Sequence, residues 1–412
     1  MTRCSPIVRW LLVACAACSL TGCFPAADEA GDAIRVMTYN IEDVRTADLQ
    51  RPDNPRLRKA AAVIQHLRPD ILLINEMTYD YPGGPSVPAD AAPGQNGQRF
   101  VERFLSTAQA DSLVPIRYAP FMAPVNTGLA SGFDLNNDGD TVTAYPTPAP
   151  PQSSGAPVPQ TPAGRAYGND AWGFGVFPGQ YGMALFVREG LTILRDSVRT
   201  FQRFRWSAMP DALRPVDPGT EAPWYSEAEW ARMRLSSKSH WDVPVRLPDG
   251  RVVHVLASHP TPPGFDGEED RNGRRNHDEI RFWADYLSQR PYIVDDNTRP
   301  GGLPDSALFV VMGDQNADPD EGDTVQQSIR QLLDHERVQD TVVPTASPHG
   351  QAAYPDLDPD DTAAWGLRVD YVLPATNLDV LASGVWRPVG ADTIGVSVSD
   401  HFPVWIDLAP AR

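Results

Sequence analysis

The sequence predicts an α/β fold in one large domain, because apolar strand-like runs alternate with amphipathic helical segments and several runs end in polar residues. The clearest run covers residues 308–312, stops at Gly313 and is followed by Asp314 and Asn316. Side chains two positions apart in extended backbone point the same way, so this carboxylate and this amide face one point beyond the strand. Open α/β sheets bind ligands at that end. Alone, the stretch is equally compatible with a polar turn.

The N-terminus has the pattern of an export signal. Arg3 and Arg9 precede an apolar run over residues 10–20 that is too short for a permanent membrane span. The ending Leu20-Thr21-Gly22-Cys23 resembles the lipobox of bacterial lipoproteins, which implies cleavage before Cys23 and its acylation. The alternative is an ordinary signal peptide with an incidental cysteine. We expect a lipoprotein signal peptide (1–22), a lipid-anchored tether (23–33) and a catalytic domain (34–412) on the periplasmic or cell-surface face of a bacterial membrane.

Cysteine usage and charge exclude several classes of site. The other cysteines, Cys4, Cys15 and Cys18, all lie in the predicted signal, so the folded body has no disulfide, thiolate metal site or cysteine nucleophile. Loss of residues 1–22, which carry two arginines and no acid, takes the formal net charge from −18 to −20. Such an acidic chain is unsuited to tight nucleic-acid binding through basic patches, although a metal-dependent nuclease stays open. Frequent glycine (31) and proline (41) favour long loops.

In the first half of the chain, two predicted strands end in polar residues. Residues 35–40 alternate as a strand that ends at Asn40, with Glu42 two positions further. Residues 55–67 have the apolar spacing of a helix, and a buried strand over 71–75 ends at Glu76. A carboxylate there is costly unless it is solvated, paired or bound to metal. We expect a helix over 98–110, an irregular Pro/Gly-rich insertion over about 120–179 and a strand over 181–187.

In the second half, residues 241–246 and 251–258 predict a β-hairpin that delivers His259. A helix is expected to begin near Asn276, with Glu279 as the partner of a capping pair. The strand that ends at Asp314 comes next, followed by a short strand over 368–373. Residues 399–403, which include His401, lead into a terminal strand over 404–408.

Five blocks carry a family resemblance. They are Met37-Thr-Tyr-Asn40, Ile74-Asn-Glu76, Gly313-Asp-Gln-Asn316, Arg368-Val-Asp370-Tyr371 and Ser399-Asp-His401-Phe-Pro403. In this order they resemble the signature set of the endonuclease/exonuclease/phosphatase superfamily. The resemblance spans about residues 35–408, with looser matches over 120–179 and 210–236, and Ser258-His259-Pro260 replaces the commoner Thr-His-Leu. It implies a four-layer α/β sandwich (deoxyribonuclease I-like): two packed mixed sheets flanked by helices, with one cleft at the strand ends.

The residue types fit phosphoester hydrolysis. A hard divalent cation, Mg²⁺ or Mn²⁺ as a substitute, prefers oxygen ligands. Glu76 is the natural primary ligand, helped by Asn40. Glu42 or Asp400 would hold a second ion or order metal-bound water.

Donors to a phosphoryl transition state and a base are also present. We expect His401, His259 and Asn316 to face the phosphoryl oxygens, and Asp314 to deprotonate the water that attacks in line with the leaving oxygen. Asp370 should accept a hydrogen bond from His401 and favour its cationic form. The resemblance implies these same roles.

Three further segments are candidate ligand contacts. Two residues precede the hairpin and lie near the expected phosphate site: Lys238 and His240. Four follow the His259 strand and are suited to a second anionic group, although pairing with the acids at 266–270 is the stronger alternative: Arg271, Asn272, Arg274 and Arg275. Four have the spacing of half an EF-hand-type calcium loop: Asp134, Asn136, Asp138 and Asp140. Tyr145 stands where the twelfth-position glutamate is required, so a polar turn is the alternative to a Ca²⁺ site.

The function that we expect is an exported, membrane-anchored, Mg²⁺-dependent phosphoester hydrolase, a phosphodiesterase or phosphatase acting on small or lipid phosphates. Two alternatives stay open. One is an extracellular metal-dependent endonuclease or exonuclease on DNA or RNA, and the other is a catalytically silent lipoprotein that binds phosphate ligands. A serine esterase is disfavoured because no Gly-x-Ser-x-Gly elbow occurs. We expect a monomer without an obligate protein partner.

Overall fold

Two six-stranded mixed β-sheets pack face to face in the computed structural model, which describes residues 33–389 and 398–410. The predicted signal peptide (1–22), Cys23 and the tether up to residue 32 lie outside the described residues. The first sheet has the order β11-β12-β1-β2-β4-β3, and the second has β10-β9-β8-β7-β5 with β6 paired to β7. The strands of the first sheet are β1 (Ile34–Val44), β2 (Ile71–Met77), β3 (Tyr118–Phe121), β4 (Met183–Arg188), β11 (Leu378–Val385) and β12 (Val404–Pro410). Those of the second are β5 (Thr192–Ile193), β6 (Arg199–Thr200), β7 (Trp241–Arg246), β8 (Val252–Ala257), β9 (Leu308–Asp314) and β10 (Asp370–Pro374).

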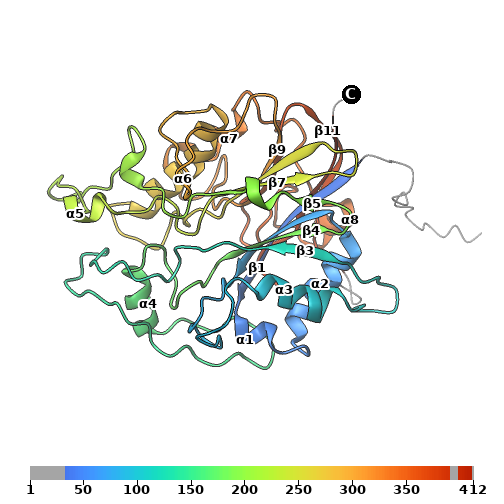
Figure 1. Ribbon diagram of the computed structural model, residues 1–412, viewed down its shortest axis with the longest axis horizontal. Helices are drawn as coiled ribbons and strands as arrows, with labels where there is room; N and C mark the ends of the chain where they lie inside the picture. Colours follow the sequence, from blue (N-terminus) through green and yellow to red (C-terminus); the bar gives the residue numbers. More distant parts are fainter. Residues whose placement is uncertain (1–32, 390–397, 411–412) are drawn as a thin grey trace, which may run out of the picture. The chain divides into compact units, whose positions relative to one another are not determined.

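Helices cover the outer face of each sheet, which confirms the predicted four-layer sandwich (Figure 1). Helices α1, α2 and α3 lie over the first sheet, and α6 and α7 lie over the second. The α-helices are α1 (Thr46–Leu49), α2 (Pro55–Leu67), α3 (Asn96–Phe100), α4 (Pro162–Asn169), α5 (Glu227–Trp230), α6 (Arg271–Leu287), α7 (Arg330–Leu333) and α8 (Pro348–Ala353). A π-helix, η1 (Val101–Leu105), and three 3₁₀ turns, η2 (Arg195–Ser197), η3 (Trp206–Ala208) and η4 (Val325–Gln327), complete the set.

The period-two alternation of the strands explains the layers. In the first sheet Val36 and Leu73 point toward the second sheet and share its core, while Met37 and Leu72 point the other way and pack under α2 and η1. Both cores are fully buried at these positions. Since each strand supplies two apolar faces, the sequence reads as near-continuous apolar runs rather than strict alternation.

Two predicted helices differ from the structure. The helix expected over 98–110 begins at Asn96 and ends in the π-helix at Leu105, because the Gln65 side chain binds the carbonyl oxygens of Leu105 (3.0 Å) and Thr107 (2.8 Å). The helix expected near residue 276 begins at Arg271. The charged and glycine residues of its first turn hide the apolar periodicity, so the sequence pattern starts one turn late.

The prediction that Asn276 and Glu279 form a capping pair is wrong, since both lie inside α6, where they are buried and hydrogen-bond to neighbouring segments. Glu279 accepts hydrogen bonds from the backbone N–H groups of Ser237 and Thr261, each at 2.6 Å. Asn276 donates to the carbonyl oxygens of Thr261 and Gln315, each at 2.9 Å. These contacts fasten the segments after β8 and β9 to α6. No helix within residues 33–389 and 398–410 is both long and apolar enough to cross a bilayer.

The mixed topology brings the polar strand ends to one edge. β1 runs parallel to β2, and β8 runs parallel to β9, so the carboxyl ends of each pair lie together. β10 is antiparallel to β9 and pairs its first residue, Asp370, with Asp314. β12 is antiparallel to β1, so its amino end, just after His401, reaches the same edge. Residues far apart in the chain therefore converge on one site.

Candidate active site

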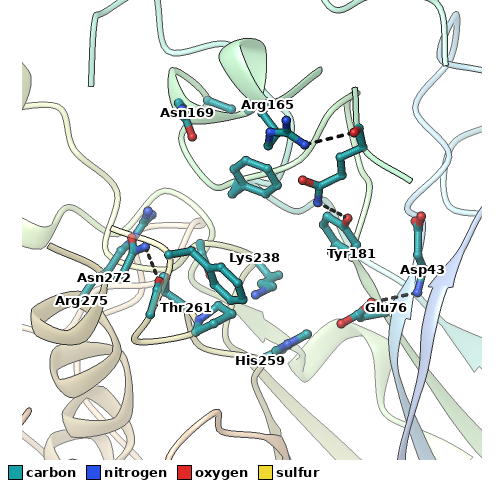
Figure 2. Close-up of a pocket in the computed structure, with 18 of the residues that line it drawn as sticks. Asp43, Glu76, Arg165, Asn169, Tyr181, Lys238, His259, Thr261, Asn272 and Arg275 are labelled. Carbon is teal, nitrogen blue, oxygen red and sulfur yellow. Dashed lines mark hydrogen bonds between the residues drawn. The ribbon is translucent and has the colours of Figure 1, made fainter. Parts of the chain in front are cut away.

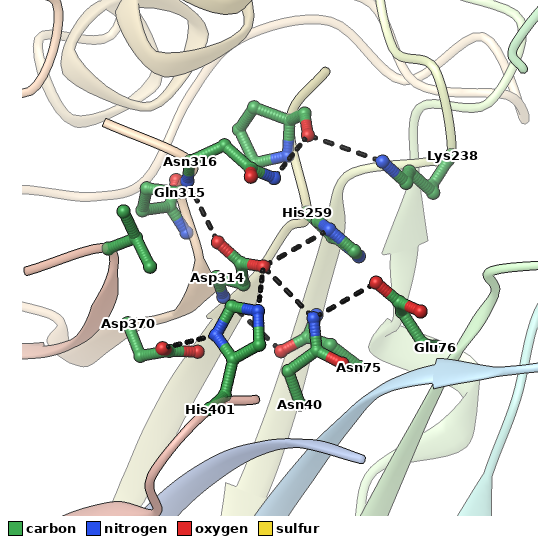
Figure 3. A network of polar contacts seen from close by, with 12 residues as sticks. Asn40, Asn75, Glu76, Lys238, His259, Asp314, Gln315, Asn316, Asp370 and His401 are labelled. Atoms are coloured by element: carbon green, nitrogen blue, oxygen red, sulfur yellow. Dashed lines mark hydrogen bonds and ion pairs between the residues drawn. The ribbon is translucent and has the colours of Figure 1, made fainter. Parts of the chain in front are cut away.

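Asp314, at the end of β9, is the centre of the polar network (Figure 3). Its Oδ2 accepts a hydrogen bond from Asn40 Nδ2 (3.0 Å) and lies 3.4 Å from His259 Nε2 and 3.6 Å from His401 Nε2. Its Oδ1 accepts from the backbone N–H of Asn316 (2.9 Å). The carboxyl is 1% exposed. Burial raises its pKa, and the charge of His401 opposes that rise.

His401 lies between two carboxylates. Its Nδ1 lies 2.8 Å from Asp370 Oδ2, the contact that the sequence predicts. Burial disfavours the charged imidazole, but Asp370 and Asp314 more than offset that effect and raise the pKa of His401 to about 10. With both ring nitrogens protonated, Nδ1–H is used by Asp370 and Nε2–H is left facing Asp314. Trp365, about half exposed, meets the His401 ring edge-on at 5.0 Å.

A second acidic group surrounds Glu76. Its Oε1 accepts from Asn40 Nδ2 (3.1 Å) and its Oε2 from the backbone N–H of Asp43 (2.8 Å). Glu42, Asp43 and Glu76 all have positive φ, at 53°, 41° and 68°, in the irregular pairing between β1 and β2. Such backbone is costly for non-glycine residues and is held here to aim side chains at one place.

The charges of this group fit a divalent cation. Burial first, and then the carboxylates of Asp400, Glu76 and Asp43, raise the pKa of Glu42 to about 7, although Arg56 opposes them. Burial also raises the pKa of Glu76. Oxygen ligands that repel one another are what a hard cation such as Mg²⁺ stabilises. Glu76 and Asn40 are the residues suited to hold it, with Glu42 beside them and Asp400 at the exposed rim.

Another group also has metal-like spacing. One ligand atom from each of Asp314, Asp370 and His401 lies within 4.8 Å of the others, and all three residues are buried. In the structure, His401 Nδ1 already contacts Asp370 Oδ2 (2.8 Å), and Nε2 faces Asp314 (3.6 Å). Both this group and the acidic group around Glu76 could therefore hold a metal ion.

His259, Asn316 and Lys238 line the other side of Asp314. His259 is buried, and burial, Lys238 and His401 lower its pKa well below the usual value, so its imidazole is neutral. Its Nδ1 has no partner among the described residues. Asn316 Nδ2 and Lys238 Nζ both donate to the carbonyl oxygen of Pro260, at 3.1 and 3.2 Å. One amide proton of Asn316 is thus already used.

A pocket of about 780 Å³ opens from this site. Glu76, His259 and Lys238 line one end, and Figure 2 shows Arg165 and Asn169 across the pocket from them. The predicted ligand contacts Arg271, Asn272 and Arg275 also line it.

The structure assigns these predicted ligand contacts different environments. Arg271 pairs with Glu269, as the alternative predicted. Arg275 donates to the carbonyl oxygens of Trp172 (2.6 Å) and Leu235 (2.8 Å), so its guanidinium holds the wall together. Arg274 does not line the pocket, and Asp270 is the nearby acid.

The predicted substrate contact of His240 is not supported. His240 is buried between Phe282 and Trp283 on α6, and its Nε2 lies 2.8 Å from the carbonyl oxygen of Glu279. Burial lowers its pKa to about 4. It is a neutral core residue that lies outside the pocket lining.

The candidate calcium loop forms a polar turn. The Asp134 carboxylate accepts from the backbone N–H groups of Asp138 (3.2 Å) and Gly139 (2.9 Å). Asp138 accepts from Asn136 Nδ2 and from the N–H of Asp140, each at 2.9 Å. Within the described residues this loop does not form a cluster with metal spacing. The Ca²⁺ site stays a prediction, and the hydrogen bonds show the polar-turn alternative.

Sequence reasoning missed several residues at the site. Asp43 orients Glu76 through its N–H, and its side chain pairs with Arg45 (2.6 Å). Tyr181 lines the pocket with φ of 57°, and Trp365 covers His401. Asp43 directly follows Glu42, so a polar pair after the strand was an available signal. Tyr181 and Trp365 lie outside the five blocks. Tyr181 begins the strand expected over 181–187, where nothing marks it as a site residue, and the loop of Trp365 gives no periodic signal.

Comparisons with known proteins give a family match and a set of similar solved structures. A family model described as "Endonuclease/Exonuclease/phosphatase family" matches residues 37–401. A search of curated proteins found no match. Among solved structures, an endonuclease/exonuclease/phosphatase from Beutenbergia cavernae is 18% identical, with 92% of this chain and 72% of that chain covered and a TM-score of 0.47. The human Nocturnin catalytic domain with bound sulfate is 14% identical (92% and 95% covered, TM-score 0.42). A mannosyl-6-phosphatase from Bacteroides thetaiotaomicron is 14% identical (91% and 99% covered, TM-score 0.41).

The family match begins in β1 and ends at His401, so it includes the first four sequence blocks, the fifth as far as His401, and every strand except β12 and the first residues of β1. Together with the two mixed sheets and their shared polar edge, this match identifies the chain as a member of the endonuclease/exonuclease/phosphatase family.

Proposed function

We propose that this protein is a Mg²⁺-dependent phosphodiesterase or phosphatase that acts on small or lipid phosphates. Members of its family typically hydrolyse phosphoester bonds and depend on metal. The observation that carries the proposal is the adjacency of two groups at one edge of the sheets: Asp370, His401 and Asp314, joined by a hydrogen bond and an ion pair, and the acidic group around Glu76. Asn40 contacts both groups, so a phosphoryl group at this edge meets a base, a cationic donor and a cation site together.

In the proposed reaction, Asp314 orients a water molecule and accepts its proton as the water attacks phosphorus in line with the leaving oxygen. The 3.6 Å between His401 Nε2 and Asp314 Oδ2 is longer than a strong hydrogen bond. The Nε2–H is therefore free to donate to a phosphoryl oxygen as negative charge develops. The second amide proton of Asn316 and the ring of His259 supply further contacts on the same side.

The cation belongs to the Glu76 side. Glu76 and Asn40 would hold it, with Glu42 or Asp400 near a second ion or an ordered water. When bound, a divalent cation offsets negative charge on the phosphoryl oxygens. In its absence the same carboxylates repel one another, which the raised pKa of Glu42 reflects.

A nuclease is the second candidate function, since the family name includes nucleases. The acidic net charge of −18 and the pocket volume of about 780 Å³ favour smaller substrates. A catalytically silent phosphate-binding protein is the third, but Glu76, Asp314 and His401 are all present and in contact through Asn40 or directly.

We also propose that the protein is exported and anchored by lipid at Cys23, as a monomer. The support is the sequence Leu20-Thr21-Gly22-Cys23 and the confinement of every cysteine to the first 23 positions. Labelling with a radioactive fatty acid should mark the wild-type protein and not Cys23→Ser. Equal labelling of the wild-type protein and the variant would refute the proposed lipid anchor at Cys23.

The catalytic test is turnover with Mg²⁺ of plasmid DNA, a bis-aryl phosphodiester, phosphomonoesters and phospholipids. We expect turnover of a small or lipid phosphoester that EDTA abolishes. Asp314→Asn and His401→Ala should each lower kcat/KM on the order of 10³-fold. Turnover insensitive to EDTA, or no turnover of any compound, would refute the hydrolase.

A further inference from the structure

One wall of the pocket comes from the irregular insertion rather than from the sheets. The insertion supplies Leu135, Val158, Gln160, Arg165 and Phe174 to the lining. The catalytic end of the same pocket comes from the last residues of β1 and β2 and from the segment that follows β8. The insertion is thus placed to select what is attached to a phosphoryl group at the strand ends.

This wall is fixed to the catalytic body by buried polar contacts. Arg56 on α2 donates to the carbonyl oxygen of Gly155 (2.6 Å), and Arg45 donates to that of Val158 (3.3 Å). Gln160 donates to the Tyr181 hydroxyl (3.0 Å). A pocket held in this way is formed before any ligand arrives, which lowers the entropy cost of binding.

The opposite end of the insertion is held just as closely. The Asp170 carboxylate accepts from the backbone N–H groups of Leu135 (3.0 Å) and Val142 (2.7 Å). Gly173 approaches so closely that a Cβ there would lie 1.9 Å from the carbonyl oxygen of Ser237. The insertion is therefore held in a fixed position beside the pocket by contacts at both of its ends.

The lining is of mixed character. Val158, Phe174, Tyr225 and Met233 give it an apolar and aromatic part, and Phe265 stands 95% exposed at the pocket with φ of 69°. Arg165 and Asn169 lie across the pocket from Glu76 and His259 (Figure 2). The Arg165 guanidinium donates to the carbonyl oxygen of Gln160 (3.1 Å) and pairs with no carboxylate among the described residues.

Size and lining narrow the class of ligand. A volume of about 780 Å³ suits a drug-sized molecule. An acyl chain needs an apolar lining throughout, and polar groups such as Arg165, Asn169 and Asn272 would lose solvent against it without gaining a partner. A ring system with a polar or anionic far end satisfies both parts of the wall.

We propose that the insertion-lined pocket binds the organic group of a small phosphoester, with an apolar ring beside Phe174 and Val158 and an anionic substituent at Arg165. The proposal rests on the proposed hydrolase function only for the place of the phosphoryl group. Arg165 then selects among substrates and takes no part in bond breaking.

The test measures binding rather than turnover, with non-hydrolysable phosphonates, Mg²⁺ and the full-length protein in titration calorimetry. Phenylphosphonate should bind at least about tenfold more tightly than methylphosphonate, and 4-carboxyphenylphosphonate more tightly still. Val158→Trp fills the apolar part of the pocket and should remove the preference for phenylphosphonate over methylphosphonate. The matched control, Val342→Trp, adds the same ring at an exposed valine outside the pocket lining and should leave the affinities for all three phosphonates unchanged.

Arg165 gives a second, independent variant. Arg165→Ala, at an exposed position, should abolish the gain from the carboxyl group and leave phenylphosphonate binding unchanged, and Arg165→Lys should restore part of that gain. Equal binding of all three phosphonates, or unchanged preferences in both Val158→Trp and Arg165→Ala, would overturn the proposal. Tighter binding of a short single-stranded oligonucleotide than of any phosphonate would overturn it as well. Phosphonate selectivity without turnover of any phosphoester would instead refute the hydrolase and leave the pocket assignment in place.

Discussion

Asp370→Asn tests the charge state of His401. The pKa of His401 rises from the usual 6.5 to about 10, which corresponds to about 5 kcal/mol in favour of the imidazolium. Asp370 is the nearer carboxylate, at 2.8 Å against 3.6 Å for Asp314. If it supplies half of the net effect, its neutral isostere lowers the pKa of His401 to about midway between these two values, so the imidazolium is still the main form at neutral pH and kcat/KM falls on the order of tenfold toward pH 9.

The assay is the pH dependence of kcat/KM for an aryl phosphodiester with saturating Mg²⁺, from about pH 5 to about pH 9. A folded-state pKa above the usual value keeps wild-type His401 protonated across that range. In Asp370→Asn the pKa falls toward neutrality, so activity should decline as pH rises and recover partly toward acid pH. The exposed Asp379→Asn is the control for loss of one surface charge. A variant profile parallel to that of the wild type would show that Asp370 does not act through the His401 proton.

Three further predictions address metal, acid stability and backbone packing. Glu76→Gln should weaken Mg²⁺ binding in calorimetry and lower activity on the order of 10³-fold, and unchanged Mg²⁺ affinity would place the cation elsewhere. Burial lowers the pKa of His240 to about 4, so the unfolded chain takes up a proton near pH 6.5 that the folded chain resists. Stability should therefore fall as pH drops from 6.5 to about 4, by up to about 3 kcal/mol, and urea unfolding should show a smaller loss in His240→Gln. Gly173→Ala forces a Cβ against the Ser237 carbonyl and should lower Tm by several degrees, whereas an unchanged Tm would mean that the insertion moves freely.

The strands were predictable because their signals are local. The apolar runs before Glu76 and Asp314 and the turn at residues 247–250 correspond to β2, β9 and the β7–β8 hairpin of the structure. Helix starts were less predictable, since charged side chains fill the first turn of α6 and Gly273 interrupts its pattern. Tertiary contacts decide that start: Asp266 accepts from the backbone N–H of Asn272 at 2.6 Å.

The site residues also differ in whether a local sequence signal or a tertiary contact determines their position. Residues that end strands could be found from sequence, because a polar group after an apolar run is a local feature. His240 instead precedes a strand, and its predicted substrate contact is not supported, since only the packing of α6 shows that its ring faces Phe282. Arg165 was not predicted, because no strand end marks it and its position depends on how the insertion folds back over the cleft.

One buried arginine shows why the strand ends and the insertion form a single site. Arg56, 5% exposed, donates to the carbonyl oxygens of Ile41 and Glu42 in the strand that carries Asn40, and to Val398 just before His401 (3.3 Å). The same side chain donates to Gly155 in the insertion. Nη1 shares its two N–H groups among Ile41, Glu42 and Val398, whereas the Nε–H has Gly155 as its acceptor among the described residues, so moving the insertion leaves that N–H unsatisfied at a cost of about 1–3 kcal/mol. The position of the insertion and the position of β1, which carries Asn40, are therefore coupled. Changes in the insertion should alter catalysis as well as specificity.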